Sequence, residues 1–156
     1  MRRTISLFTG VGGLDLGLEA AGFDVAVAVE CDPDAVDAIR KNRRWWPIPE
    51  DCGHPLPIEA IDSPSLLRIA QLHVGEAALL VGGPPCQPFS KSGYWASGDA
   101  LRLRDPRANT LREYLRVLRD TLPETFLLEN VPGLKFEGKD EGLLFIGRRL
   151  RAGEKR

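Results

Sequence analysis

Four short apolar segments constrain the fold of this chain more than any other feature of its sequence. They span residues 4–8, 25–29, 78–81 and 125–128; apart from Thr4, Ser6 and Thr125 every residue in them is apolar, and we interpret each as continuous rather than alternating. Continuous apolar strands are typical of a parallel sheet that is covered on both faces. Helical patterns fall between the segments. Strands that alternate with helices predict a doubly wound α/β domain with a mostly parallel sheet and right-handed crossovers.

Local signals place the first two helices. A leucine-rich segment over residues 14–21 predicts a short helix that Gly22 ends. Asp32 and Pro33 predict the N-cap and the first residue of a second helix. An aspartate side chain accepts the free N–H groups at a helix start, and proline needs no N–H donor there.

A proline-rich stretch over residues 45–64 predicts an irregular loop that carries one short strand. The Trp45–Trp46 pair within it is interpreted as packing rather than as a platform for stacked bases. A helix is expected over residues 65–72. Apolar residues at helical spacing over residues 111–118 predict another helix, which ends before Pro123.

The 156 residues suffice for one domain with one core, so we expect a single unit over residues 1–156. Its 43% hydrophobic and 28% charged residues are typical of a soluble globular protein. No apolar run approaches the ~20 residues of a membrane span, and the first residues do not resemble a secretory signal. Widely spaced cysteines and two isolated histidines form no disulfide or metal-binding pattern, so we expect a cytoplasmic protein without a metal.

The net charge of −1 does not indicate a strongly basic nucleic-acid-binding domain, although it is compatible with a local basic patch. Arg102, Arg104 and Arg107 cluster after the third apolar segment, and further basic residues lie between Arg148 and Arg156. A solvated surface and a nucleic-acid contact explain the first cluster equally well. A solvated surface is the better explanation for the tail.

Glycines follow the first predicted strand at its junction with a helix. The segment reads Phe8-Thr9-Gly10-Val11-Gly12-Gly13-Leu14, and glycine at such a turn lets a ligand approach the backbone closely. A dinucleotide-binding loop would have a third glycine where this chain has Asp15. Glu30 follows the first glycine by about 20 residues, the offset of a carboxylate that binds ribose. The pattern indicates an adenosine ligand without phosphates, such as S-adenosylmethionine, or plain turn chemistry.

A second candidate site follows the third apolar segment. Cys86 ends the segment Gly82-Gly83-Pro84-Pro85-Cys86, a proline-stiffened loop at the carboxyl end of a strand, where ligands of open α/β sheets bind. A thiol there is a candidate nucleophile if its thiolate is stabilised. Glu129 follows the fourth apolar segment and would face the same crevice. A cysteine with a glutamate, and without a histidine base, suits attack on a heteroaromatic ring better than acyl transfer.

The segments FTGVGGLDLG, VECD, GGPPCQPFS and LLENVPGL follow one another over most of residues 4–136. Together they resemble the signature motifs of the DNA cytosine-C5 methyltransferases, which implies a Rossmann-like fold that binds S-adenosylmethionine. The resemblance implies that a cytosine is flipped out of double-stranded DNA, that Cys86 adds to C6 of its ring, and that Glu129 protonates the N3 side. Carbon 5 then accepts the methyl group, and S-adenosylhomocysteine is released. A restriction-modification system is the expected setting.

The same resemblance assigns further residues by their positions in the motifs. Those expected to contact the cofactor are Phe8, Gly10, Gly12, Gly13, Leu14, Glu30, Cys31, Asp51, Pro85 and Leu111. Those expected to lie near the DNA or the flipped base are Gln87, Ser90, Arg107 and Asn130. The sequence departs from the family at Asp51, which lies in Glu-Asp-Cys instead of the usual Gly-Asp-Ile, and at Ala108, where the family often has glycine.

The sequence lacks the later motifs of the family, which are an arginine motif, a target-recognition domain and a last motif that completes the cofactor pocket. We therefore expect a sheet that is incomplete on its C-terminal side. A truncated sequence, one subunit of a split enzyme with a C-terminal partner, and a degenerate remnant all remain open.

Two other functions also remain open: a non-catalytic module that binds a cofactor or partner, and an RNA cytosine-C5 methyltransferase. An NAD dehydrogenase is disfavoured, because Asp15 breaks the glycine pattern and Cys86 and Glu129 would have no role.

Overall fold

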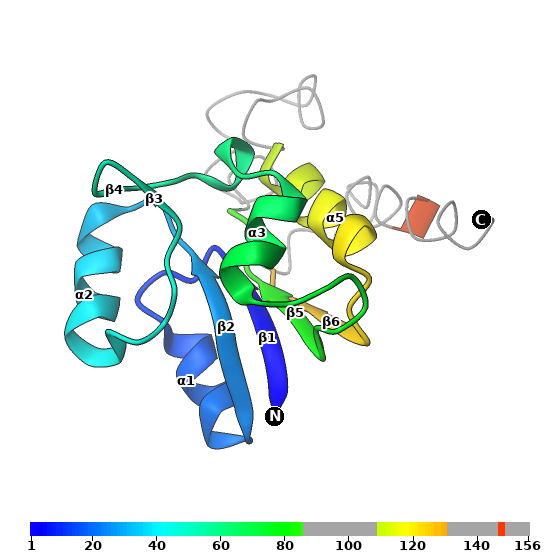
Figure 1. Ribbon diagram of the computed structural model, residues 1–156, viewed down its shortest axis with the longest axis horizontal. Helices are drawn as coiled ribbons and strands as arrows, with labels where there is room; N and C mark the ends of the chain where they lie inside the picture. Colours follow the sequence, from blue (N-terminus) through cyan, green and yellow to red (C-terminus); the bar gives the residue numbers. More distant parts are fainter. Residues whose placement is uncertain (86–108, 131–146, 149–156) are drawn as a thin grey trace.

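The computed structural model describes residues 1–85, 109–130 and 147–148 of the chain. Across these residues one sheet has the strand order β2-β1-β5-β6, and each neighbouring pair is parallel (Figure 1). The strands are β1 (Arg2–Leu7), β2 (Phe23–Val29), β5 (Leu79–Gly82) and β6 (Thr125–Leu128). They coincide closely with the four continuous apolar segments, so the predicted parallel α/β sheet is confirmed.

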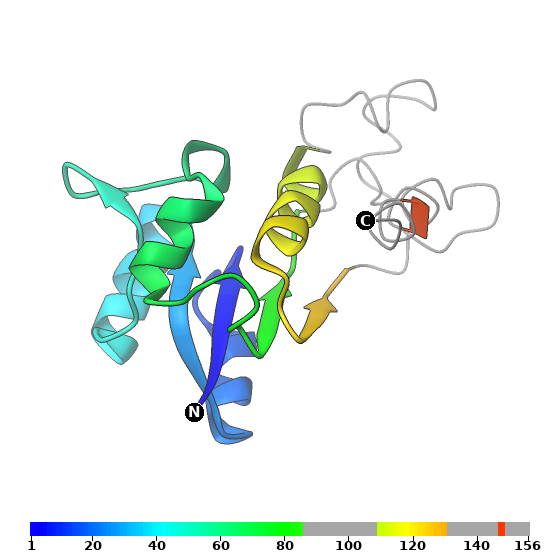
Figure 2. The same ribbon diagram turned by 45° about the vertical axis from the view of Figure 1, so that its right-hand side comes forward.

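Helices cover both faces of this sheet. α3 (Ser63–Ala70) and α5 (Asn109–Thr121) lie on one face, and α1 (Gly13–Ala20) and α2 (Pro33–Arg43) lie on the other (Figures 1 and 2). The larger hydrophobic core packs beneath α3 and α5, and its fully buried members include Leu7, Val27, Leu66, Leu80 and Tyr114. The smaller core on the α2 side consists of Val25, Ala28, Ile39 and Trp46. Apolar packing on both faces explains why the strand sequences are continuously apolar.

The predicted start of α2 is confirmed, and α1 lies within one residue of its predicted range at each end. The Asp32 carboxylate accepts the backbone N–H groups of Asp34 at 2.9 Å and Ala35 at 3.3 Å, and Pro33 is the first residue of α2. Gly22 follows α1 with a φ of 87°, a left-handed conformation that glycine adopts without strain.

The other two helices differ slightly from their predicted ranges. α3 begins at Ser63 rather than at residue 65, because the Asp62 carboxylate caps it and accepts the N–H of Ser65 at 2.6 Å. α5 extends beyond the predicted 111–118 at both ends and stops, as expected, before Pro123.

The proline-rich stretch forms a two-stranded hairpin of β3 (Glu50–Asp51) and β4 (His54–Pro55), followed by the 3-10 helix η1 (Ile58–Ala60). The packing interpretation is confirmed for Trp46, which is 4% exposed. It is wrong for Trp45, which is 62% exposed and has the Arg43 guanidinium 5.4 Å from its ring centre. A cation can stack on an exposed aromatic face because the face carries partial negative charge.

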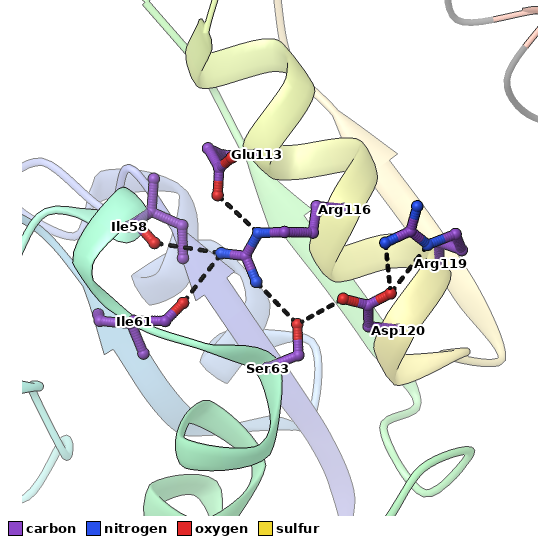
Figure 3. A network of polar contacts seen from close by, with 7 residues as sticks. All are labelled: Ile58, Ile61, Ser63, Glu113, Arg116, Arg119 and Asp120. Carbon is purple, nitrogen blue, oxygen red and sulfur yellow. Dashed lines mark hydrogen bonds and ion pairs between the residues drawn. The ribbon is translucent and has the colours of Figure 1, made fainter.

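Arg116 joins α5 to the segment that precedes α3 (Figure 3). Its guanidinium donates to the backbone carbonyls of Ile58 at 3.2 Å and Ile61 at 2.9 Å, and to the Ser63 hydroxyl at 2.8 Å. Glu113, on the same helix, accepts from Arg116 Nε at 2.6 Å. These charge-assisted hydrogen bonds hold α5 against η1 and the start of α3.

β6 is an edge of the sheet as far as the structure describes the chain, and it has exposed apolar side chains. Phe126 is 41% exposed and Leu127 is 43% exposed. None of the described helices is both long and apolar enough to span a membrane.

Candidate active site at the carboxyl ends of the strands

The four strands of the main sheet end level with one another. Leu7 lies opposite both Val29 and Gly82, and Gly82 lies opposite Leu128. The loops that follow the strands therefore leave the sheet along one edge, where ligands of open α/β sheets bind. These loops carry the glycine segment, Glu30, the segment that leads to Cys86, and Glu129.

The glycine segment turns sharply over the end of β1. Phe8, Gly10 and Gly12 all have positive φ angles, at 56°, 57° and 86°. Glycine adopts this conformation freely, whereas a phenylalanine adopts it only where its surroundings enforce it, and such residues cluster at functional sites. The N–H of Gly12 donates to the Thr9 carbonyl at 3.0 Å, and Gly12 is then the N-cap of α1.

The glycines of this segment serve different physical purposes. A Cβ on Gly12 would lie 2.9 Å from the ring of Trp46, so both packing and φ require glycine there. At Gly10 only the positive φ requires glycine, because a Cβ there would meet no other segment of the described chain within 4 Å. Gly13 has the same open surroundings and no positive φ. The fold alone therefore does not explain a glycine at position 13, whereas the close approach of a ligand would.

Glu30 connects the glycine segment to the end of β2. Its Oε2 accepts the N–H of Gly10 at 2.7 Å, and its Oε1 accepts the N–H groups of Cys31 and Asp32 at 2.8 and 2.9 Å. A carboxylate has about four lone-pair positions, so three backbone donors fix its orientation and leave capacity for a ligand hydroxyl. Glu30, which the sequence predicts to bind the ribose of a cofactor, therefore lies beside the glycine segment.

Asp15 occupies the position of the missing third glycine and is buried, with 1% exposure. Burial raises the pKa of this carboxyl, and a hydrogen bond with Ser6 of β1 offsets only part of the rise. The neighbouring Leu14 and Leu16 are 40% and 38% exposed. α1 thus turns its acid toward the sheet and leaves Leu14 accessible next to the glycine segment.

The start of the Cys86 loop packs against Glu129. The N–H of Glu129 donates to the Gly82 carbonyl at 3.0 Å, just beyond the end of β6. A Cβ on Gly83 would lie 2.8 Å from Glu129 Oε2, so the carboxylate lies directly against the backbone of Gly83. Cys86 follows Gly83 by three residues in the sequence.

The first turn of α5 contacts the same loop. The Thr110 hydroxyl donates to the Pro85 carbonyl at 3.5 Å, and Pro85 itself is exposed. Leu111, the next residue, is 4% exposed and packs in the larger core. Of these two predicted cofactor contacts, Pro85 therefore lies on the accessible edge and Leu111 lies below it.

The remaining predicted residues are spread along the same edge or lie outside the described part of the chain. Cys31 is exposed beside Glu30; partial burial and the Glu30 charge raise the pKa of its thiol, which disfavours the thiolate. Asp51 is exposed on the hairpin, which lies at the same end of the sheet as the start of α2 (Figure 1). Asn130 is half-buried next to Glu129. Those outside the described residues are Cys86, Gln87, Ser90 and Arg107.

Sequence reasoning missed two aromatic residues that shape this edge. Trp46 lies beneath Gly12, and its indole N–H donates to Glu19 at 2.8 Å. Tyr114 packs against Gly82, and its hydroxyl contacts carbonyls of both β5 and β6. The available signal was the polar group that each of these aromatic side chains carries, since a buried hydroxyl or indole N–H needs a hydrogen-bond partner. In the same described ranges, no group of side chains is arranged to hold a metal ion.

Comparison with known proteins agrees with this arrangement of motifs. A family model described as C-5 cytosine-specific DNA methylase matches residues 2–148. The chain therefore belongs to the C-5 cytosine-specific DNA methylase family.

Two curated relatives are Type II methyltransferases. M.AquIA of Picosynechococcus sp. is 41% identical over 133 residues, which cover 85% of this chain and 50% of that protein. M.SacI of Streptomyces achromogenes is 39% identical over 146 residues, which cover 85% of this chain and 36% of that protein. The chain thus spans half or less of the length of these two relatives.

Solved structures show the same fold. A prophage-encoded protein of E. coli, assigned as a DNA modification methyltransferase, has a TM-score of 0.73 and 29% identity, covering 97% of this chain and 38% of that one. The Dnmt2 methyltransferase of S. pombe has a TM-score of 0.63 and 22% identity, covering 94% of this chain and 39% of that one. The Rossmann-like methyltransferase fold expected from the motifs is confirmed.

Proposed function

We propose that this chain carries the cofactor-binding and nucleophilic part of a DNA cytosine-C5 methyltransferase of a restriction-modification system. The observation that supports this most directly is the common end of the four strands. It brings the Glu30-bound glycine segment and the Gly83–Glu129 contact to one edge of one sheet. Membership of the family and the Type II methyltransferase relatives support the same function.

S-adenosylmethionine fits the residues at this edge. Gly10 and Gly13 leave room at the backbone, and Glu30 retains acceptor capacity for a ribose hydroxyl. Leu14 and Pro85 are accessible for apolar contact. When bound, this cofactor supplies an electrophilic methyl group, and S-adenosylhomocysteine remains after transfer. The absence of a phosphate-binding third glycine suits a ligand without a pyrophosphate.

Cys86 and Glu129 would divide the chemistry on a cytosine flipped out of double-stranded DNA. The Cys86 thiolate would form a bond to C6 while protonated Glu129 donates a proton to N3, which takes up the electron pair displaced from the ring and leaves an enamine with C5 nucleophilic; N3 returns this proton when the ring is restored. Carbon 5 then forms a bond to the methyl group. Loss of the C5 proton to a base and departure of the thiolate restore the aromatic ring. In the reducing cytoplasm, Cys86 stays a free thiol for this role.

Covalent trapping tests the proposal. The chain is incubated with S-adenosylmethionine and duplex DNA that contains 5-fluorocytosine, alone and with the C-terminal part of M.SacI supplied as a second polypeptide. Fluorine at C5 cannot be removed as a proton, so the adduct persists. We expect an adduct that survives denaturation in wild type and is absent in Cys86→Ala.

The same experiment separates the alternatives. Cofactor binding by calorimetry without an adduct in either mixture would contradict the proposal and favour a binding module. An adduct on single-stranded RNA but not on duplex DNA would identify an RNA methyltransferase. An adduct that forms only with the added polypeptide would show that a C-terminal partner completes the site.

A further inference from the structure

Tyr114 connects the two strands that lead to the proposed catalytic residues. It lies on α5 with 0% exposure, and its hydroxyl is 3.2 Å from the Leu80 carbonyl and 3.1 Å from the Leu127 carbonyl. Leu80 belongs to β5 and Leu127 belongs to the neighbouring β6. The single phenolic hydrogen is thus shared between two adjacent strands. Burial raises the pKa of Tyr114, so the phenol keeps this proton at neutral pH.

The ring of Tyr114 also fixes the end of β5. A Cβ on Gly82 would lie 3.2 Å from the ring carbons Cδ2 and Cε2. The ring therefore rests on the backbone of Gly82, immediately before the segment Gly83-Pro84-Pro85 that leads to Cys86. The carbonyl of the same Gly82 accepts the N–H of Glu129.

Tyr114 is itself held by its helix. Arg116, two residues later, anchors α5 to carbonyls of the η1 segment, and Thr110 ties the first turn of α5 to Pro85 (Figure 3 shows the Arg116 contacts). Because α5 is held in place, the Tyr114 ring and hydroxyl hold the ends of β5 and β6 in fixed positions relative to the helix. Close packing leaves few alternative arrangements.

We propose that Tyr114 is a positioning residue that sets the separation between the Gly82–Pro85 segment, which precedes Cys86 in the sequence, and the Glu129 carboxylate. This inference rests on the proposed function of Cys86 and Glu129. Tyr114 touches neither cofactor nor cytosine; it acts through Gly82 and Leu127, the residues from which the two catalytic segments start. A small change in the separation of reacting groups lowers the rate of a positioned reaction severalfold or more.

The test compares Tyr114→Phe with Thr121→Val. Both variants remove a buried hydroxyl from α5, but within the described residues the Thr121 hydroxyl donates only to the Val117 carbonyl of its own helix, at 2.8 Å. Adduct formation on 5-fluorocytosine duplex is followed over time in the mixture in which wild type reacts. Binding of S-adenosylhomocysteine is measured by calorimetry, and amide hydrogen exchange is measured by NMR.

For Tyr114→Phe we expect adduct formation to slow by about tenfold while cofactor affinity changes by less than about twofold. Exchange of the Glu129 amide should accelerate, and exchange within the β1–β2 ladder should not. Thr121→Val should leave the adduct rate and the Glu129 amide unchanged. A residue with a general structural role would instead lower cofactor affinity together with the rate.

Two results would overturn the inference. The first is an unchanged adduct rate in Tyr114→Phe, and the second is an equal loss of rate in both variants. If wild type forms no adduct in any mixture, the proposed function fails. Exchange of the Glu129 amide then decides whether Tyr114 fixes the strand ends, since that measurement requires no activity: equal exchange in wild type and Tyr114→Phe would refute it.

Discussion

The two halves of the proposed site are held in place by different means. At the cofactor half, the loop is fixed by a hydrogen bond from the Gly10 N–H to Glu30, and a Cβ at Gly10 or Gly13 would meet no other segment of the described chain within 4 Å. At the catalytic half, Gly82 and Gly83 are enclosed by other parts of the protein. Gly10 and Gly13 therefore leave room for a ligand, whereas Gly82 and Gly83, like Gly12 beside Trp46, leave room for the protein itself. Substitutions should accordingly reduce binding in the first half and stability in the second.

The largest effect is expected for Gly82→Ala. The new Cβ would lie 2.8 Å from the Leu7 carbonyl, a backbone atom of the central strand, and 3.2 Å from the Tyr114 ring. This clash is relieved only if β1 and β5 move apart. We therefore expect the free energy of unfolding to fall by about 2–3 kcal/mol and the midpoint of thermal unfolding to fall by about 5–10 °C. Thermal unfolding followed by circular dichroism measures it. An unchanged midpoint would show that this half is not tightly enclosed.

The next effect concerns Glu30→Gln. A glutamine amide has one acceptor oxygen, so it cannot accept all three backbone N–H groups that the carboxylate now accepts. We expect a loss of cofactor affinity of about 10- to 100-fold, measured by calorimetry. Glu124→Gln, an exposed acid just before β6, serves as the control and should bind normally. Equal cofactor affinity in wild type and Glu30→Gln would show that Glu30 does not contribute to cofactor binding.

A smaller effect is expected for Gly13→Ala. Among the described residues, no other element lies within 4 Å of the new Cβ, so the unfolding midpoint should stay within about 2 °C of wild type. Cofactor affinity should fall about tenfold, because the methyl group would occupy the space of the ligand. Gly17→Ala, on the same helix with equally open surroundings, should leave affinity intact. If both variants bind as wild type does, the glycine segment is a plain turn.

The smallest effect is the pH dependence of Asp15. Because burial raises its pKa above the ordinary 3.8, its contribution to stability is complete below that pH and is lost as the pH rises through the folded-state pKa. Asparagine does not titrate. As the pH is raised from 4 to 7, the midpoint of thermal unfolding of Asp15→Asn should therefore rise by a few degrees relative to that of wild type. A difference in midpoint between Asp15→Asn and wild type that does not change with pH would contradict this expectation.

The sequence predicted much of this fold because its signals were local. Continuous apolar segments identified the four strands, and Asp32 with Pro33 identified the start of α2, because capping depends on residues a few positions apart. The α3 start was wrong by two residues, although Asp62 and Pro64 provide the same kind of signal. Trp45 was misassigned because adjacent residues of a turn face different surroundings.

Features that depend on contacts between distant segments could not be predicted. The sequence shows that Asp15 replaces a glycine, but not that α1 buries it beside Ser6 while Leu14 is exposed. The Tyr114 contacts join α5 to two strands, and the Trp46 contact joins a loop to Gly12. No periodicity encodes such pairs, since each depends on how separate elements pack.

Peptide mapping of the trapped adduct tests the central claim most directly. Cleavage after lysine and arginine places Cys31, Cys52 and Cys86 on separate peptides, the last on residues 69–91. Cys31 and Cys52 are exposed free thiols and serve as internal controls. We predict that the mass of methylated fluorocytosine nucleotide appears on the peptide 69–91 alone. Its appearance on the Cys31 or Cys52 peptide, or on none of the three in every mixture tested, would contradict the assignment of Cys86 as the nucleophile.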